Sequence, residues 1–170
     1  MNKLFVDDLV ERLEFELDTV TVNTQDEVRK ELVETKEYDR FPMISYEHTK
    51  DSIFEVEISE SKFLNDLSHI GTWIMGTNED ELIFILNLKS KGNILEIDAF
   101  EIRDELRGEG LGSNILSVVE SVAEQYYSSI IVSPFDTTAI NFWEHMEYEE
   151  WGNQGYFIKN LNCQSAPSFS

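Results

Sequence analysis

Three glycines fall within five positions in the stretch Arg107-Gly108-Glu109-Gly110-Leu111-Gly112-Ser113. The stretch lies between an apolar, extended segment, 94–102, and a segment with helical apolar spacing, 114–127. Because glycine has no side chain, the backbone N–H groups of such a loop are uncovered, and here they lie at the positive end of a helix. The loop could therefore bind phosphate oxygens, although a plain surface turn could carry the same glycines.

Apolar spacing and turn residues predict the elements that must position this loop. Helices are predicted at 4–13, 24–36, 61–67, 114–127 and 137–146, and strands at 19–22, 53–58, 71–76, 82–88, 94–102, 130–132 and 155–161. Thr24 and Glu27 predict a capping box at the start of the second helix. The close strands from 71 to 102 favour an antiparallel meander, and the strand–helix–strand order from 94 to 132 requires a parallel crossover. We predict an α/β (α+β) fold with a mixed central sheet, mostly antiparallel, flanked by helices, and one parallel pair at the glycine loop.

Length and composition favour a single domain at 1–161, with a helix-rich first part (1–68), a core (69–161) and a loose tail (162–170). The only cysteine, Cys163, excludes an internal disulfide and favours a reducing compartment. The opening MNKLFVDDLVERLE lacks the unbroken apolar run of a signal peptide, and charges interrupt every long apolar stretch. A soluble, cytoplasmic protein that is not bound to a membrane is therefore expected. No metal-ligand spacing is present, so no metal is predicted.

The formal net charge is −21, from 13 Lys and Arg against 34 Asp and Glu. Such a surface repels DNA and RNA, so direct nucleic-acid binding is not expected. Three interpretations of the charge are open: it keeps the protein in solution, it attracts a cationic substrate, or it imitates a nucleic acid towards a partner.

Four stretches, in this order, resemble the GNAT superfamily of acetyl-coenzyme A-dependent N-acetyltransferases. Residues 100–106 look like the end of the family's fourth strand, and Arg107-x-x-Gly110-x-Gly112 matches its pyrophosphate loop. Residues 136–148 are similar to its later helix, and 155–161 to its closing strand. The resemblance covers about residues 70–161 and is carried by order and spacing together.

The resemblance implies a site for acetyl-coenzyme A. Backbone N–H groups of the glycine loop would surround the pyrophosphate, and the backbone of the fourth strand would pair with the pantetheine arm. A bulge in that strand would turn an N–H towards the thioester oxygen. The residues it implies for coenzyme A binding are Phe100, Ile102, Leu106, Arg107, Gly108, Glu109, Gly110, Leu111, Gly112, Ser113, Asp136, Phe142 and Trp143.

The reaction that the resemblance implies needs a group that takes a proton from the ammonium form of the acceptor. Glu96 and Asp98 are two residues apart in the expected strand, hence on one face, beneath the acetyl position. Glu96 has the better position by analogy with family members that use a glutamate on the fourth strand. The exposed polar face of a half-buried strand would carry the same residues, so both interpretations stay open.

The leaving thiolate is often protonated in this family by a tyrosine on the later helix, but that position is Trp143 here. An indole does not titrate at any useful pH. Tyr148 is the candidate substitute, with Tyr126, Tyr127 or water as alternatives, and Ser133 and His145 are weaker candidates. Glu147 stands where a glycine usually ends this helix; in a left-handed conformation it would cost about 1 kcal/mol.

Two functions from different classes follow. The first is an N-acetyltransferase that moves an acetyl group to a primary amine of a cationic small molecule or peptide, by direct transfer in a ternary complex. The second is an inactive acidic protein of the same fold that occupies a basic site on a partner. The intact glycine loop favours the enzyme, and Trp143 with the charge of −21 favours the binder. A homodimer is compatible with either.

Overall fold

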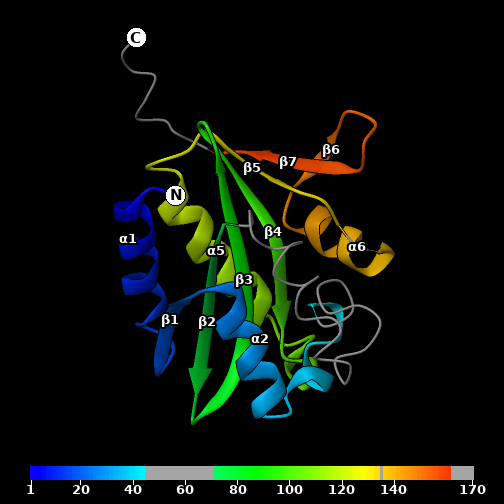
Figure 1. Ribbon diagram of the computed structural model, residues 1–170. Coiled ribbons are helices and arrows are strands. Elements are labelled where there is room, and N and C mark those ends of the chain that lie inside the picture. Colours follow the sequence, from blue (N-terminus) through cyan, green and yellow to red (C-terminus); the bar gives the residue numbers. More distant parts are fainter. Residues whose placement is uncertain (45–70, 135, 162–170) are drawn as a thin grey trace.

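A seven-stranded sheet runs through the computed structural model, which describes residues 1–44, 71–134 and 136–161 (Figure 1). The strands are β1 (Thr19–Asn23), β2 (Thr72–Asn78), β3 (Glu81–Lys91), β4 (Ile94–Ile102), β5 (Ser129–Val132), β6 (Glu149–Trp151) and β7 (Tyr156–Asn160), in the spatial order β1-β2-β3-β4-β5-β7-β6. Within the described residues, β4 and β5 form the parallel pair and all other neighbours are antiparallel. The predicted fold class is confirmed.

Helices cover both faces of the sheet (Figure 1). They are α1 (Lys3–Leu13), α2 (Gln25–Glu34), α5 (Leu111–Ala123) and α6 (Thr137–His145), with short 3-10 turns η1 (Tyr38–Arg40) and η2 (Asp104–Leu106). On β3, Phe84 and Leu86 pack towards α1 and α5, while Ile85 packs towards α2. Because both faces of β3 are buried, its sequence is a continuous apolar run instead of an alternating one.

The predicted elements are found with small shifts at their ends. The capping box at Thr24 and Glu27 is confirmed, since the hydroxyl accepts from the Glu27 N–H and the carboxylate accepts from the Thr24 N–H. The strand β6 is absent from the sequence prediction, because its three residues are all exposed and show no alternation. The expected strand at 53–58, helix at 61–67 and tail at 162–170 lie outside the described residues.

The helix after the glycine loop begins earlier than predicted. α5 starts at Leu111, and Gly110 is its N-cap with φ of 83°, a left-handed conformation that glycine adopts without strain. The apolar spacing that predicted a start near 114 marks only the buried face of α5, formed by Ile115, Leu116, Val119, Val122 and Ala123. The first turn of α5 is therefore part of the glycine loop itself.

The last turn of α6 closes with a Schellman motif. The Tyr148 N–H donates to the Trp143 carbonyl at 2.9 Å and the Glu147 N–H donates to the Glu144 carbonyl at 2.9 Å. Glu147 has φ of 73°, so it adopts the left-handed conformation that is costly for a residue with a side chain.

This geometry predicts that Glu147→Gly stabilises the protein. Removing the side chain relieves the left-handed strain, worth about 1 kcal/mol, which corresponds to a rise in Tm of about 2–4 °C for a chain of this size. Calorimetry on the purified variant measures the change. The matched control is Glu144→Gly, within α6, which should lower stability by about 1 kcal/mol because that position is helical. An equal loss of stability in Glu147→Gly and Glu144→Gly would contradict the inference that Glu147 is strained.

Candidate functional site

A cleft opens where β4 and β5 diverge. Their parallel pairing runs from Ile94 and Ser129 to Ile97 and Val132 and then stops. The walls of the cleft come from both strands, from α6 and from the N-terminal part of the chain. The lining residues are Met43, Ile44, Ile97, Asp98, Ala99, Phe100, Glu101, Val132, Ser133, Pro134, Ala139 and Trp143.

A β-bulge lies at the beginning of this divergence. On β3, Asn87 pairs with Ala99 and the next residue, Leu88, pairs with Ile97, so Asp98 has no partner across the ladder. A bulge bends its strand and redirects the backbone groups of the extra residue. The bulge that the resemblance implied in this strand is thus present, next to the cleft.

The glycine loop presents a row of backbone donors at the start of α5. Gly108 and Gly110 have φ of 82° and 83°, and a Cβ at either would meet open space. The first bond of α5 runs from the Asn114 N–H to the Gly110 carbonyl, and no side chain caps the helix. Within the described part of the chain, none of the N–H groups from Gly108 to Ser113 donates to a protein acceptor. Six consecutive donors at a helix N-terminus fit the oxygens of a diphosphate.

Close packing accounts for the third glycine of the loop. A Cβ at Gly112 would lie 3.4 Å from Cγ1 of Ile102 and 3.6 Å from Cε1 of Phe142. The first turn of α5 is therefore held directly against β4 and α6. Among the other residues implied for coenzyme A binding, Phe100 and Trp143 line the cleft, Leu106 precedes the loop, and Glu109 is exposed within it.

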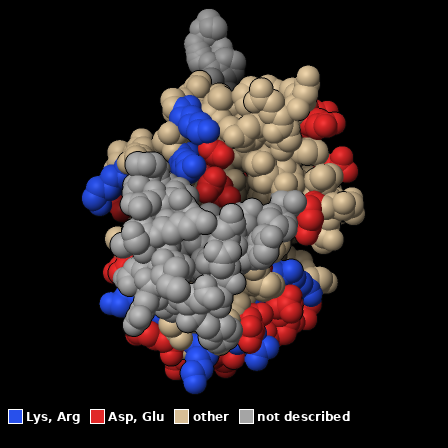
Figure 2. All heavy atoms as spheres, turned by 45° about the vertical axis from the view of Figure 1, so that its right-hand side comes forward, with Lys and Arg blue, Asp and Glu red and all other residues tan. Residues whose placement is uncertain are grey.

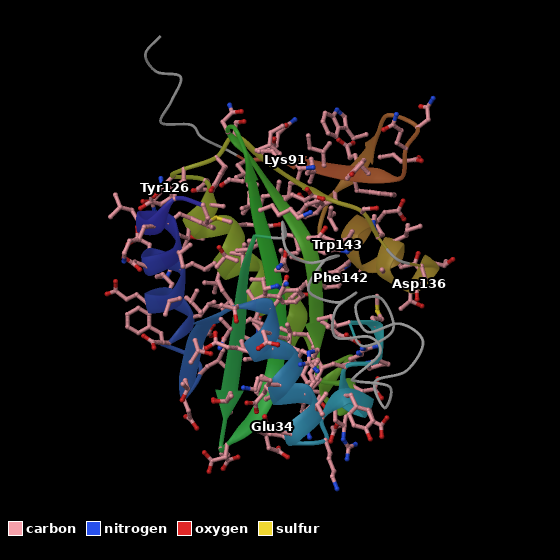
Figure 3. All side chains as sticks on the ribbon, in the orientation of Figure 1. Glu34, Lys91, Tyr126, Asp136, Phe142 and Trp143 are labelled. Atoms are coloured by element: carbon pink, nitrogen blue, oxygen red, sulfur yellow. The ribbon has the colours of Figure 1, made fainter. Side chains whose placement is uncertain are left out.

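Both candidate bases form ion pairs with lysines of β3. Glu96 is buried, with Oε1 2.7 Å from Nζ of Lys91, and Asp98 is partly exposed, with Oδ1 3.4 Å from Nζ of Lys89. The hydrogen bond from Lys91 to Glu96 raises the pKa of Lys91. Figure 3 shows Lys91 near the end of the β3–β4 hairpin, and Figure 2 shows acidic and basic side chains intermixed on one face. Of the two carboxylates, only Asp98 lines the cleft.

Aromatic rings form the α6 side of the site. Trp143 is buried and packs edge-on against Phe142 at 5.1 Å and Tyr148 at 4.9 Å between ring centroids, and the ring of Phe100 is 6.4 Å away. Asp136 accepts from the Ala139 N–H at 2.8 Å and is the N-cap of α6. Figure 3 shows Asp136 at the outer end of α6, whereas Trp143 and Phe142 lie towards the sheet.

Tyr148 does not lie where an acid that protonates the leaving thiolate would have to lie. It is buried outside the lining of the cleft, and its hydroxyl donates to Oε2 of Glu120 at 2.8 Å. Burial, together with the charge of Glu120, raises the pKa of the Tyr148 hydroxyl, which makes it a weaker acid. Lys159 completes this cluster by donating to Oε1 of Glu120 at 3.1 Å. The expectation that Tyr148 protonates the thiolate is therefore not supported by its position.

The two alternative tyrosines also lie away from the cleft lining. The Tyr126 hydroxyl donates to Asp8 of α1, and the Tyr127 hydroxyl is 2.5 Å from Oγ of Ser90. Both rings pack against Phe5 of α1. Of the weaker candidates, Ser133 lines the cleft and His145 does not, so Ser133 or water is left to protonate the leaving thiolate.

Sequence reasoning missed two buried polar residues, one in the wall of the cleft and one on β3 paired with a lining residue of β4. Glu101 lines the cleft and is buried on β4. Asn87 is completely buried on β3, opposite Ala99, and neither its amide oxygen nor its amide nitrogen has a hydrogen-bond partner among the described residues. A signal for Asn87 did exist, because it is a single amide directly after the apolar run Leu82-Ile83-Phe84-Ile85-Leu86.

Comparison with known proteins identifies the fold. No model of a known protein family and no curated protein matches the sequence. Solved structures do: an acetyltransferase from Thermus thermophilus matches at TM-score 0.61 and 12% identity, covering 84% of this chain and 97% of that chain. PH1933 from Pyrococcus horikoshii follows at 0.57 and 12% identity, covering 85% and 99%. The GNAT family N-acetyltransferase YhbS from Escherichia coli, in complex with CoA, matches at 0.52 and 9% identity, covering 86% and 84%. The chain therefore has the GNAT fold.

Membrane-spanning helices and clusters of metal ligands are both absent from the described residues. None of the helices there is both long and apolar enough to cross a bilayer. Within the same residues, no three His, Cys, Asp or Glu side chains come together as metal ligands would.

The unpaired amide of Asn87 predicts a gain in stability on Asn87→Leu. Leucine has nearly the same shape and removes two buried polar atoms, each of which costs about 1–3 kcal/mol when unpaired. The expected result is a higher urea midpoint with an unchanged slope. Asn160→Leu, at an exposed position of β7, is the control and should change stability by less than about 0.5 kcal/mol. A loss of stability in Asn87→Leu would mean that the native amide is satisfied, for example by an ordered water.

Proposed function

We propose that this protein is an N-acetyltransferase that transfers the acetyl group of acetyl-coenzyme A directly to a primary amine in a ternary complex. The observation that carries the proposal is the row of six backbone donors from Gly108 to Ser113 that have no acceptor among the described residues, next to a cleft between diverging parallel strands. The GNAT fold supports it, because solved structures of that fold include acetyltransferases.

The chain offers a group for each part of the bound donor. Acetyl-coenzyme A supplies a thioester, whose carbonyl carbon accepts the amine. The N–H groups of the glycine loop bind the diphosphate, and the edge of β4 beyond Ile97 pairs with the pantetheine amides. A backbone N–H at the Asp98 bulge stabilises the negative charge that develops on the carbonyl oxygen. Phe142 and Trp143 exclude water from the α6 side.

A carboxylate of β4 takes the proton from the acceptor ammonium. Asp98 is the better placed of the two candidates, because it lines the cleft and is partly exposed. Glu96 is buried and held by Lys91. No titrating side chain is assigned as the acid that protonates the leaving thiolate. A thiolate is already a fair leaving group, so it can depart first and take its proton from water.

The acceptor is proposed to be cationic. A net charge of −21 raises the local concentration of cations around the protein and speeds their encounter with it. Close to the cleft, Asp98 and Glu96 are each paired with a lysine. The attraction for a cation therefore comes from the acidic surface as a whole and not from one deep anionic pocket.

Coenzyme A binding is the first test. Saturation at 100 times Kd should stabilise the native state by about 2.7 kcal/mol, and Gly110→Trp should abolish the resulting rise in Tm by obstructing the loop. Gly92→Trp is a matched control, because Gly92 also has a positive φ, 63°, with open space around its Cβ, but lies in the β3–β4 turn. It should keep the full shift.

The same measurement separates the enzyme from an acidic binding protein. A wild-type melting curve that stays unchanged at millimolar coenzyme A would overturn the proposal and favour the binder.

The general base is tested by the pH dependence of turnover. Asp98→Asn should lower kcat/KM by about 100-fold at low pH, where the acceptor is mostly protonated, and by less at high pH, where the free amine is abundant. Glu96→Gln should cause a smaller loss across the same range. Wild-type rates for Asp98→Asn at every pH would remove Asp98 from this role.

A further inference from the structure

Glu101 is a buried carboxylate in the wall of the cleft, and three donors from two parts of the chain converge on it. Its side chain is 2% exposed. Oε2 accepts from the Met43 N–H at 3.0 Å, and Oε1 accepts from the Ile44 N–H at 2.8 Å. Met43 and Ile44 are in helical conformation and also line the cleft, opposite the strands. We call these two residues the N-terminal wall.

The third donor is Arg107, the first residue of the glycine loop. Its Nη2 donates to Oε2 of Glu101 at 2.6 Å, and its Nε donates to the Ile102 carbonyl at 3.3 Å. The guanidinium is thus fastened to β4 through two groups, while 40% of the side chain stays exposed. A guanidinium has five N–H donors, of which two make these contacts, while Nη1 is also 3.6 Å from Oδ1 of Asp104, so only part of the rest is left for an anion at the loop.

Glu101 depends on these partners. Burial raises the pKa of its carboxyl group, and the N–H groups of Ile44 and Met43 together with Arg107 act against that rise. Removing one partner of a buried ion pair leaves an uncompensated charge, which strongly destabilises its surroundings. Without Arg107, the carboxylate would protonate or move, and the two wall amides would lose part of their acceptor.

The contacts therefore join three walls of one site. The glycine loop is attached through Arg107, the strand that borders the pantetheine slot carries Glu101, and the N-terminal wall is attached through its backbone. When an anion binds and orders the glycine loop, the position of Arg107 becomes fixed. A fixed Arg107 holds Glu101, the acceptor of the two wall amides, so ordering the wall then costs less conformational entropy. Coupling of this kind is reciprocal between the two ligands.

We propose that Arg107 and Glu101 form a positioning pair that couples occupation of the glycine loop to order in the N-terminal wall. Because this wall lines the same cleft as Asp98, the proposed base, the acceptor amine binds beside it and does so with positive cooperativity towards coenzyme A. The inference rests on the proposed function. It assigns Arg107 a task beyond contact with phosphate and gives Glu101 a role although it touches neither reactant.

Amide hydrogen exchange in nitrogen-15 spectra measures this coupling at the two wall amides. In the wild-type protein, saturating coenzyme A should slow exchange of the Met43 and Ile44 amides by at least about fivefold, the lower end of typical coupling. In Arg107→Met, both amides should exchange faster without ligand, and coenzyme A should no longer slow them. Arg12→Met, at the end of α1, is the control and should behave as wild type.

Two further variants keep the test decisive if Arg107→Met folds poorly. Arg107→Lys retains the charge on a single nitrogen, which cannot serve Glu101 and the Ile102 carbonyl together, so its coupling should be intermediate. Glu101→Gln keeps one carbonyl acceptor and should lose most of the coenzyme A effect. Once an acceptor amine is found, the KM for that amine should rise about tenfold in Glu101→Gln, with a smaller change in kcat.

The possible results separate the two proposals. A thermal shift with coenzyme A together with unchanged or faster exchange at Met43 and Ile44 would overturn the coupling and leave the acetyltransferase proposal standing. Wild-type coupling in Arg107→Met would likewise overturn it. An absence of any thermal shift in the wild type removes the proposed function, and the coupling with it.

Discussion

The parallel pairing of β4 with β5 extends over only four residue pairs, and the site depends on where it ends. The bulge at Asp98 bends β4, so the strand beyond Ile97 no longer follows its neighbour. An edge with unpaired N–H and C=O groups would be costly in a closed interior, but it is useful where an extended ligand completes the ladder. The same divergence brings the first turn of α5 to the mouth of the cleft. Both halves of the site therefore follow from one interruption in a sheet.

The proposed anion site belongs to a strongly acidic chain and has little positive charge around it. A diphosphate approaching a chain of charge −21 is repelled, and Arg107 is the only basic residue between positions 104 and 158. Backbone donors in direct contact can still dominate, because distant charges are screened beyond about 8 Å. Arg107 is also already engaged with Glu101 at 2.6 Å. Binding of the anion therefore rests mainly on backbone N–H groups, which carry no formal charge and do not titrate, and only the remaining N–H groups of Arg107 add to them.

The polar residues next to Trp143 have a structural role, whereas the candidate catalytic residues lie on β4. The buried Tyr148 forms a hydrogen-bonded group with the partly buried Glu120 and Lys159, which joins α5, α6 and β7 next to Trp143. A tyrosine in that environment holds its proton more tightly, which suits a structural donor. The candidate catalytic groups instead lie on β4, where Asp98 lines the cleft and the buried Glu96 forms an ion pair with the half-exposed Lys91.

The sequence by itself determined the order of elements, the parallel crossover and the glycine loop, because these depend on local spacing and on conformations that few residues can adopt. The capping box at Thr24 was predictable for the same reason, whereas the left-handed conformation of Glu147 became known only from the structure. Only the tertiary structure decided the partners of the charged side chains. Glu101 joins residues 57 and 58 positions away in the chain, and Tyr148 joins one 28 positions away. Such contacts depend on which faces the folded sheet brings together, and a pattern of neighbouring residues carries no information about distances across the fold.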